Sequence, residues 1–214
     1  MRHLLCRGLT SGLILVLSAV CHAHPHSWID LRVALATDDR GRITALHQSW
    51  LMDPIYSVLL IEDMAPEARG ESLDEKLDWI ARTILGNLTE YRYFTEIEAE
   101  GRAIAAFQAF DPRLERVGGR LDFRFELRLD EPLDARANKI RYTVYDPTYF
   151  IEILHAEQDA LRFVDGAEGC ESRRIPPRPD PAIVARAAAM AVDQRADPTL
   201  GRYFAEWMEV RCPH

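Results

Sequence analysis

Residues 121–129, LDFRFELRL, alternate apolar and charged side chains without interruption. Successive side chains of a β-strand point to opposite faces of a sheet, so a period of two predicts a strand with one buried face and one solvent-facing side. This is the clearest alternation in the chain. It predicts a fold built on β-sheet, with the apolar positions in the core.

Similar alternation is found on both sides of this stretch. Residues 140–144 (IRYTV) repeat it, and in residues 28–36 Ile29, Leu31 and Val33 alternate with Asp30 and Arg32. A turn at 38–41 and a second strand at 42–52 predict a hairpin with the strand at 28–36. Shorter strands are expected at 93–100, 103–110, 150–155 and 161–164.

Helices are predicted in two parts of the chain. Asp53 followed by Pro54 is a helix-start signal, and residues 72–88 have apolar residues at helical spacing. The Pro-rich segment 176–181 predicts a tether, after which helices are expected at 182–192 and 199–208. The predicted fold class is therefore α+β: a largely antiparallel β-sheet body with packed helices (24–175) and a C-terminal helical tail (182–214), forming one domain.

Charge and motif content exclude several functions. The formal net charge is −8, without a Lys/Arg cluster beyond the first residues, which disfavours nucleic acid as a partner. The sequence has no G-x-S-x-G, H-E-x-x-H, P-loop or G-x-G-x-x-G motif. We therefore expect a protein that is not an enzyme and that takes no small organic substrate.

The first 23 residues have the pattern of a secretory signal peptide. Arg2 and Arg7 precede an uncharged, Leu-rich stretch at 8–20, and Cys21-His22-Ala23 ends it. A transmembrane helix and a lipoprotein modified at Cys21 are the alternatives. Cleavage after Ala23 predicts a periplasmic chain, 24–214, whose formal charge is −10 because two arginines and no acid are removed.

The mature chain keeps two cysteines, Cys170 and Cys212. An even pair in an oxidising compartment predicts one disulfide bond. The alternative is a pair of thiolate metal ligands, which their wide separation disfavours.

Cleavage would place His24-Pro25-His26 at the new N-terminus. Pro25 biases His24 toward extended backbone, and residues two apart on a strand point to the same side, so both imidazoles can reach one ion. Imidazole suits zinc, nickel and copper, and the freed amino group of His24 is a possible third ligand. The alternative is a solvated terminus without a role.

Two or three histidines leave a metal shell incomplete. Candidates for the remaining ligands are His47, Asp53, Asp146 and His155. Taken singly, His47 fits a surface position on a strand, Asp53 a helix N-cap and Asp146 a turn residue, while His155 has no visible partner.

Several short motifs together resemble a bacterial periplasmic family, domain of unknown function 1007. They are AHPHSWID (23–30), DRGRI (39–43), Trp50 with Asp53, Tyr56 and Ser57, YDPTY (145–149), and GRYFA (201–205) with Cys212. The family's HPH corresponds to His24 and His26, and its Trp-x-x-Asp pattern to Trp50 and Asp53. This chain departs from that pattern with Leu51-Met52 between the two, and with Pro54 where an acidic residue is common.

The resemblance implies metal handling. It predicts a periplasmic protein that binds a divalent transition metal ion, zinc first with nickel or cobalt as alternatives, and that supports an inner-membrane permease of the nickel/cobalt/zinc type. One alternative is a metal-free regulatory or docking subunit of the transporter. Another is a copper redox protein that uses the amine and ring of His24.

Overall fold

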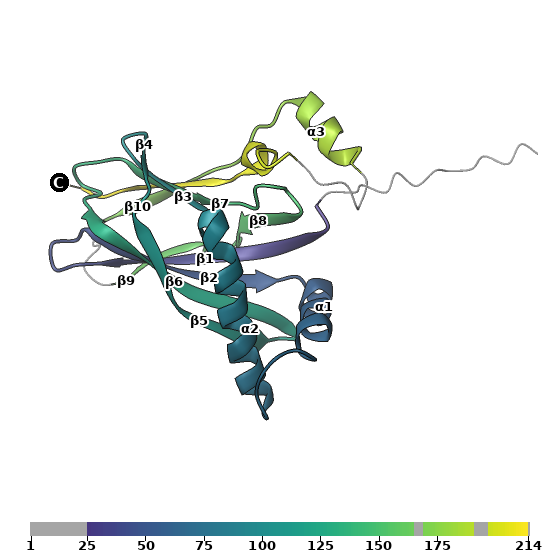
Figure 1. The fold of residues 1–214 in the computed structure, drawn as a ribbon. Helices are drawn as coiled ribbons and strands as arrows, with labels where there is room; N and C mark the ends of the chain where they lie inside the picture. The colour runs from purple at the N-terminus through teal and green to yellow at the C-terminus, as the bar shows by residue number, and fades with distance from the viewer. Residues whose placement is uncertain (1–24, 165–168, 191–196, 214) are drawn as a thin grey trace, which may run out of the picture.

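Two β-sheets pack face to face in the computed structural model, which describes residues 25–164, 169–190 and 197–213. The predicted signal peptide, its cleavage site and His24 therefore lie outside the described residues. In Figure 1 the two sheets lie one above the other, and α2 runs in front of them. The start of β1, α1 and α3 lie at the same end of the molecule.

The first sheet, sheet A, has the order β5-β6-β2-β1-β8, and β9 also pairs with β1. Neighbours along the β5-β6-β2-β1 path are antiparallel, whereas β8 and β9 run parallel to the first and second halves of β1. Its strands are β1 (Ser27–Thr37), β2 (Ile43–Met52), β5 (Phe107–Val117), β6 (Arg120–Leu133), β8 (Ile151–His155) and β9 (Leu161–Val164).

The second sheet, sheet B, has the order β10-β11-β7-β3-β4, and all its pairs are antiparallel. Its strands are β3 (Thr95–Ala99), β4 (Arg102–Ile104), β7 (Ile140–Val144), β10 (Glu171–Ile175) and β11 (Trp207–Arg211).

Three α-helices and two 3-10 helices complete the described part of the chain. Ser72 begins α2 with a capping box, in which its hydroxyl accepts from the Glu75 N–H and the Glu75 carboxylate accepts from the Ser72 N–H. The helices are α1 (Pro54–Met64), α2 (Leu73–Leu88) and α3 (Pro181–Ala188), with the 3-10 helices η1 (Thr89–Phe94) and η2 (Gly201–Phe204).

The core lies between the inner faces of the sheets and under α2. The apolar positions of the 121–129 stretch are all buried, as are Ile29, Leu31 and Val33 of β1. Trp50 is also buried, 5.3 Å from the Phe125 ring, and its indole N–H donates to the Gln48 side chain at 2.8 Å. Alternation therefore predicted correctly which face of β1 and of β6 enters the core.

The α+β class and the largely antiparallel body are confirmed, but two local predictions are wrong and one strand was missed. The strand predicted at 103–110 is two strands, because β4 ends at Ile104 and β5 begins at Phe107. Strand β10 was not predicted. The helix predicted at 199–208 is instead η2 followed by β11, which lies between β10 and β7 in sheet B. Pairing on both sides decides the strand conformation there, so local spacing did not reveal it.

The C-terminal segment is therefore not a helical tail throughout. The helix predicted at 182–192 is present as α3, which ends at Ala188, and residues 191–192 lie outside the described part. The predicted disulfide between Cys170 and Cys212 is present, and the two residues are 42 apart in the sequence. It joins the residues that flank the paired strands β10 and β11.

Among the described residues, no helix is both long and apolar enough to span a membrane.

Candidate functional site

The start of β1 is held by a buried carboxylate, that of Asp53. This residue caps α1, and its Oδ1 accepts from the N–H groups of Ile55 and Tyr56 at 2.9 Å each. Its Oδ2 accepts from the Ser27 hydroxyl and, at 3.4 Å, from the Trp28 N–H. One side chain that is 2% exposed therefore joins the first residues of β1 to the first turn of α1.

A second buried carboxylate, Asp146, fixes the loop before β8. Its Oδ1 accepts from the N–H and the hydroxyl of Thr148 at 2.8 Å each, and its Oδ2 accepts from the N–H groups of Phe150 and Ile151 at 3.0 Å each. Because this one carboxylate accepts four hydrogen bonds, it fixes the backbone conformation of the whole turn.

Gly201 packs directly against this turn. Its N–H donates to the Pro147 carbonyl at 2.9 Å, and a Cβ atom placed on it would lie 1.8 Å from the Asp146 carbonyl oxygen. Only glycine fits such a close backbone approach. The YDPTY and GRYFA motifs are therefore parts of one packed unit.

His26 lies between these two anchors. Its N–H donates to the Phe150 carbonyl at 2.9 Å, and its ring lies 4.7 Å from the Phe150 ring. Asp146 holds the N–H of that same Phe150, and Asp53 holds Ser27, the residue after His26. The histidine therefore occupies a fixed place, which we call the N-terminal corner: His26, Ser27, Asp53, Asp146 and Phe150.

Asp53 and Asp146 both act on the pKa of the Tyr56 phenol. Burial raises this pKa, and the charges of Asp146 and Asp53 raise it further. Residues 53 and 146 are far apart in the sequence, yet both act on one phenol. The fold thus places three of the predicted ligands, His26, Asp53 and Asp146, in one part of the molecule, where Ser27 and Phe150 link them.

Whether these groups suit a metal ion depends on their lone pairs. A carboxylate offers about four acceptor positions, and each of the two aspartates already accepts four hydrogen bonds. Within 25–164, 169–190 and 197–213, no three His, Cys, Asp or Glu residues are grouped to hold a metal. The corner thus provides an anchored imidazole at His26, and His24 lies outside the described residues.

The other predicted ligand, His47, lies elsewhere. It is exposed near the middle of β2, opposite Ala34 of β1 and Glu126 of β6. Ala34 is eight residues beyond His26, which corresponds to about 26 Å along an extended strand. The structure therefore does not bring His47 to the N-terminal corner.

His155 has partners that sequence reasoning missed. It is buried, its Nδ1 lies 2.8 Å from a Glu206 carboxylate oxygen, and its Nε2 lies 3.0 Å from the Tyr142 hydroxyl. Because His155 is on β8 and Tyr142 on β7, this contact crosses from sheet A to sheet B. Glu206 is 51 residues away in the sequence, and no local pattern links the two.

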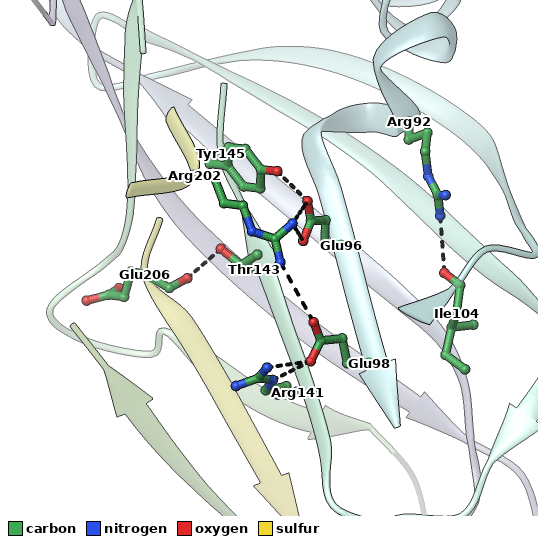
Figure 2. A network of polar contacts seen from close by, with 9 residues as sticks. All are labelled: Arg92, Glu96, Glu98, Ile104, Arg141, Thr143, Tyr145, Arg202 and Glu206. Atoms are coloured by element: carbon green, nitrogen blue, oxygen red, sulfur yellow. Dashed lines mark hydrogen bonds and ion pairs between the residues drawn. The ribbon is translucent and has the colours of Figure 1, made fainter. Parts of the chain in front are cut away.

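Charged side chains pair with one another on the outer face of sheet B. Figure 2 shows Arg202 between Glu96 and Glu98, with Arg141 on the other side of Glu98. The Arg202–Glu96 distance is 2.8 Å and the Arg141–Glu98 distance 2.5 Å. Tyr145 donates to Glu96, and burial, this hydrogen bond and the Glu96 charge raise the pKa of Tyr145 to about 12.

Fold and corner together define a class: an α+β protein of two facing sheets in which two buried carboxylates anchor a histidine at the start of the first strand. The chain belongs to the family described as protein of unknown function (DUF1007), whose model matches residues 9–212. This confirms the family resemblance stated from the motifs.

The chain is also similar to two bacterial proteins. An uncharacterized protein of Haemophilus influenzae is 27% identical over 197 residues, which covers 89% of this chain and 91% of the relative. An uncharacterized 15.5 kDa protein of Spirochaeta aurantia is 25% identical over 120 residues, which covers 55% of this chain and 85% of the relative.

Proposed function

We propose that the protein is a periplasmic binding protein for a divalent transition metal ion, held by histidines at the N-terminal corner and passed to an inner-membrane transporter. Zinc is the ion we favour, with nickel and cobalt as alternatives. The single observation that carries the proposal is the anchoring of His26. Two buried carboxylates, far apart in the sequence, hold its neighbours: Asp53 holds Ser27, the next residue, and Asp146 holds Phe150, whose carbonyl accepts from the His26 N–H.

The proposed ligands are His24 and His26. The extended backbone that Pro25 predicts from the sequence would put both imidazoles on one side, and signal cleavage would add the amino group of His24. We assign Asp53 and Asp146 a positioning role, because binding a metal would cost each of them hydrogen bonds that hold the backbone. An open, histidine-based site also exchanges its ion more readily than a closed thiolate site, which suits delivery.

Calorimetric titration of the chain beginning at His24 tests the proposal. We expect saturable one-to-one binding of zinc, nickel, cobalt and copper. Copper should bind most tightly, because affinities follow a general order that does not itself identify the ion used in the cell. The double variant His24→Ala/His26→Ala should bind at least about tenfold more weakly, since it loses both imidazoles.

A matched control is His47→Ala, which removes an exposed imidazole far from the corner. It should keep the affinity of the unmodified chain. Absence of binding by the folded, correctly processed protein would refute the proposal, and so would equal affinity in the double variant and the control.

A docking subunit is the second candidate function, favoured by exposed apolar side chains beside the same corner. Trp28 is 46% exposed, Ile55 70% and Val58 51%, and the Trp28 carbonyl accepts from the Asp53 N–H. Replacing these three residues by serine should abolish transport while leaving metal binding intact if the corner docks on the transporter. Unchanged transport would rule this role out.

A further inference from the structure

The outer face of sheet A contains a hollow of about 620 Å³ surrounded by arginines. Arg32 of β1, Arg113 of β5 and Arg162 of β9 line it, together with His47 and Ser49 of β2. The volume is within the range of small-molecule sites. We call this feature the arginine hollow.

Strand register explains the hollow. One row across the sheet runs Arg32, Ser49, Arg124, Arg113, since each is the cross-strand partner of the next. In the adjacent row Arg162 lies beside Ala34, which faces His47. Short side chains at Ser49 and Ala34 therefore lie among long ones, and this leaves a depression in the sheet surface.

The charges around the hollow are only partly compensated. Throughout the described ranges, Arg32, Arg113 and Arg162 form no ion pair within 4.0 Å, whereas Arg124 pairs with Asp122 at 2.7 Å and Glu115 at 3.1 Å. The cross-strand pair Arg113–Arg124 places two like charges opposite each other, which is unfavourable by itself.

Three acidic side chains also line the hollow: Glu126, Asp111 and Asp159. Arg128 holds Glu126 through two hydrogen bonds at 2.9 and 3.2 Å, and Asp111 acts electrostatically on the same Arg128. Four arginines and three acids therefore line the hollow, an excess of one positive charge, and three of the four arginines form no ion pair within the described ranges. This local excess of cations occurs in a chain of formal charge −8.

We propose that the arginine hollow binds a small ligand that carries two or more anionic oxygen groups, phosphate or carboxylate. The guanidinium fork matches the geometry of such groups and can bind them through two parallel hydrogen bonds. An overall negative chain repels anions, so binding depends on these local cations. The inference is independent of the metal proposal and adds a ligand class that the sequence did not predict.

Calorimetric titration at low salt, with the mature chain free of added metal, tests the hollow. The probes are inorganic pyrophosphate, citrate and inorganic phosphate. We expect saturable binding, tighter for the first two because they carry more anionic groups. Each single Arg→Gln change at 32, 113 or 162 should weaken binding roughly tenfold, and the triple change by more.

The matched control is the triple variant Arg102→Gln/Arg116→Gln/Arg178→Gln. These arginines are exposed and lie outside the hollow, and the variant has the same net charge as the triple variant in the hollow. Circular dichroism of both variants checks that they fold. The control should bind the probes as the unmodified chain does.

Vesicle sedimentation distinguishes the two possible sources of the anionic group, a lipid headgroup and a soluble anion. Binding to vesicles with anionic phospholipid, but not to neutral vesicles, together with loss in the hollow variant, would mean that the group is a lipid headgroup. Binding of the free probes alone would mean a soluble anion. Failure to bind any of these probes saturably, or equal binding by the two triple variants, would overturn the proposal.

Discussion

Carboxylates at the N-terminal corner and on the outer face of sheet B have different partners. Asp53 and Asp146 are 2% and 6% exposed and accept mainly from backbone N–H groups and hydroxyls. Glu96, on the sheet B face, accepts from Tyr145 and Arg202, and the Arg202 side chain is 54% exposed. The first arrangement fixes the course of the chain, while the second joins side chains at the surface.

The difference predicts unequal contributions to stability. A backbone N–H that loses a buried acceptor is left without a partner, and hydrogen bonds to charged groups contribute about 1.5–3 kcal/mol each. An exposed ion pair contributes between about 0 and 1 kcal/mol, because water solvates both groups when it breaks. Burial and backbone partners, rather than the number of contacts, should determine how much each carboxylate contributes to the free energy of unfolding.

Asp146→Ala should have the largest effect. It leaves the N–H groups of Thr148, Phe150 and Ile151 without their acceptor. We expect a loss of about 3–5 kcal/mol in the free energy of unfolding. Urea denaturation followed by circular dichroism measures it.

Glu96→Ala is the matched comparison, since it also removes a carboxylate with several polar contacts. It should cost about 1 kcal/mol or less. Equal losses in Asp146→Ala and Glu96→Ala would show that the distinction between the two regions is wrong.

Glu206 lies between these extremes, because its carboxylate is buried but its partner is a side chain that can be protonated. Glu206→Gln keeps an acceptor oxygen for His155 and removes the charge. We expect a loss of about 2 kcal/mol at neutral pH. Thermal or urea unfolding at several pH values measures both this loss and its pH dependence.

The sign of that dependence follows from the pKa of Glu206. Burial raises this pKa, but the hydrogen bonds from the His155 side chain and N–H and the charges of His155 and Arg174 outweigh it, so the pKa lies below its ordinary value of 4.5. The ionised carboxylate then stabilises the fold above that value, and its contribution is lost as the pH falls through the lowered pKa. The difference between the unmodified chain and Glu206→Gln should therefore shrink below about pH 4.5. A difference that stays constant or grows on acidification would contradict this account.

Sequence patterns predicted the fold correctly for strands that have one buried face and one solvent-exposed face. The alternation of Ile29, Leu31 and Val33 predicted both β1 and its buried side correctly. It failed for β10 and β11, whose charged residues Arg173 and Glu209 face each other across strands. This pairing of opposite charges depends on the register between the two strands, so the local sequence does not reveal it.

The candidate site was predictable to a similar extent. Proline at position 54 correctly indicated Asp53 as a helix cap, and Asp146 was correctly interpreted as a turn residue. The Ser27–Asp53 contact and the Glu206 partner of His155 depend on tertiary packing. The arginine hollow depends on the register of five strands, and no single segment contains its signal.

The smallest effect is expected for Arg202→Met, which retains an apolar stem of similar length and removes the guanidinium. It breaks the contacts to Glu96 at 2.8 Å and to Glu98 at 4.0 Å (Figure 2), yet Glu98 keeps Arg141. Because half of the Arg202 side chain is exposed, water replaces the lost partner, and the cost should stay below about 1 kcal/mol. Urea unfolding at low salt and at 1 M NaCl measures it, and the cost should decrease at high salt because the charges are screened. A loss above about 2 kcal/mol that persists at high salt would mean that this pair contributes as a buried group does, and that the two regions stabilise the fold in the same way.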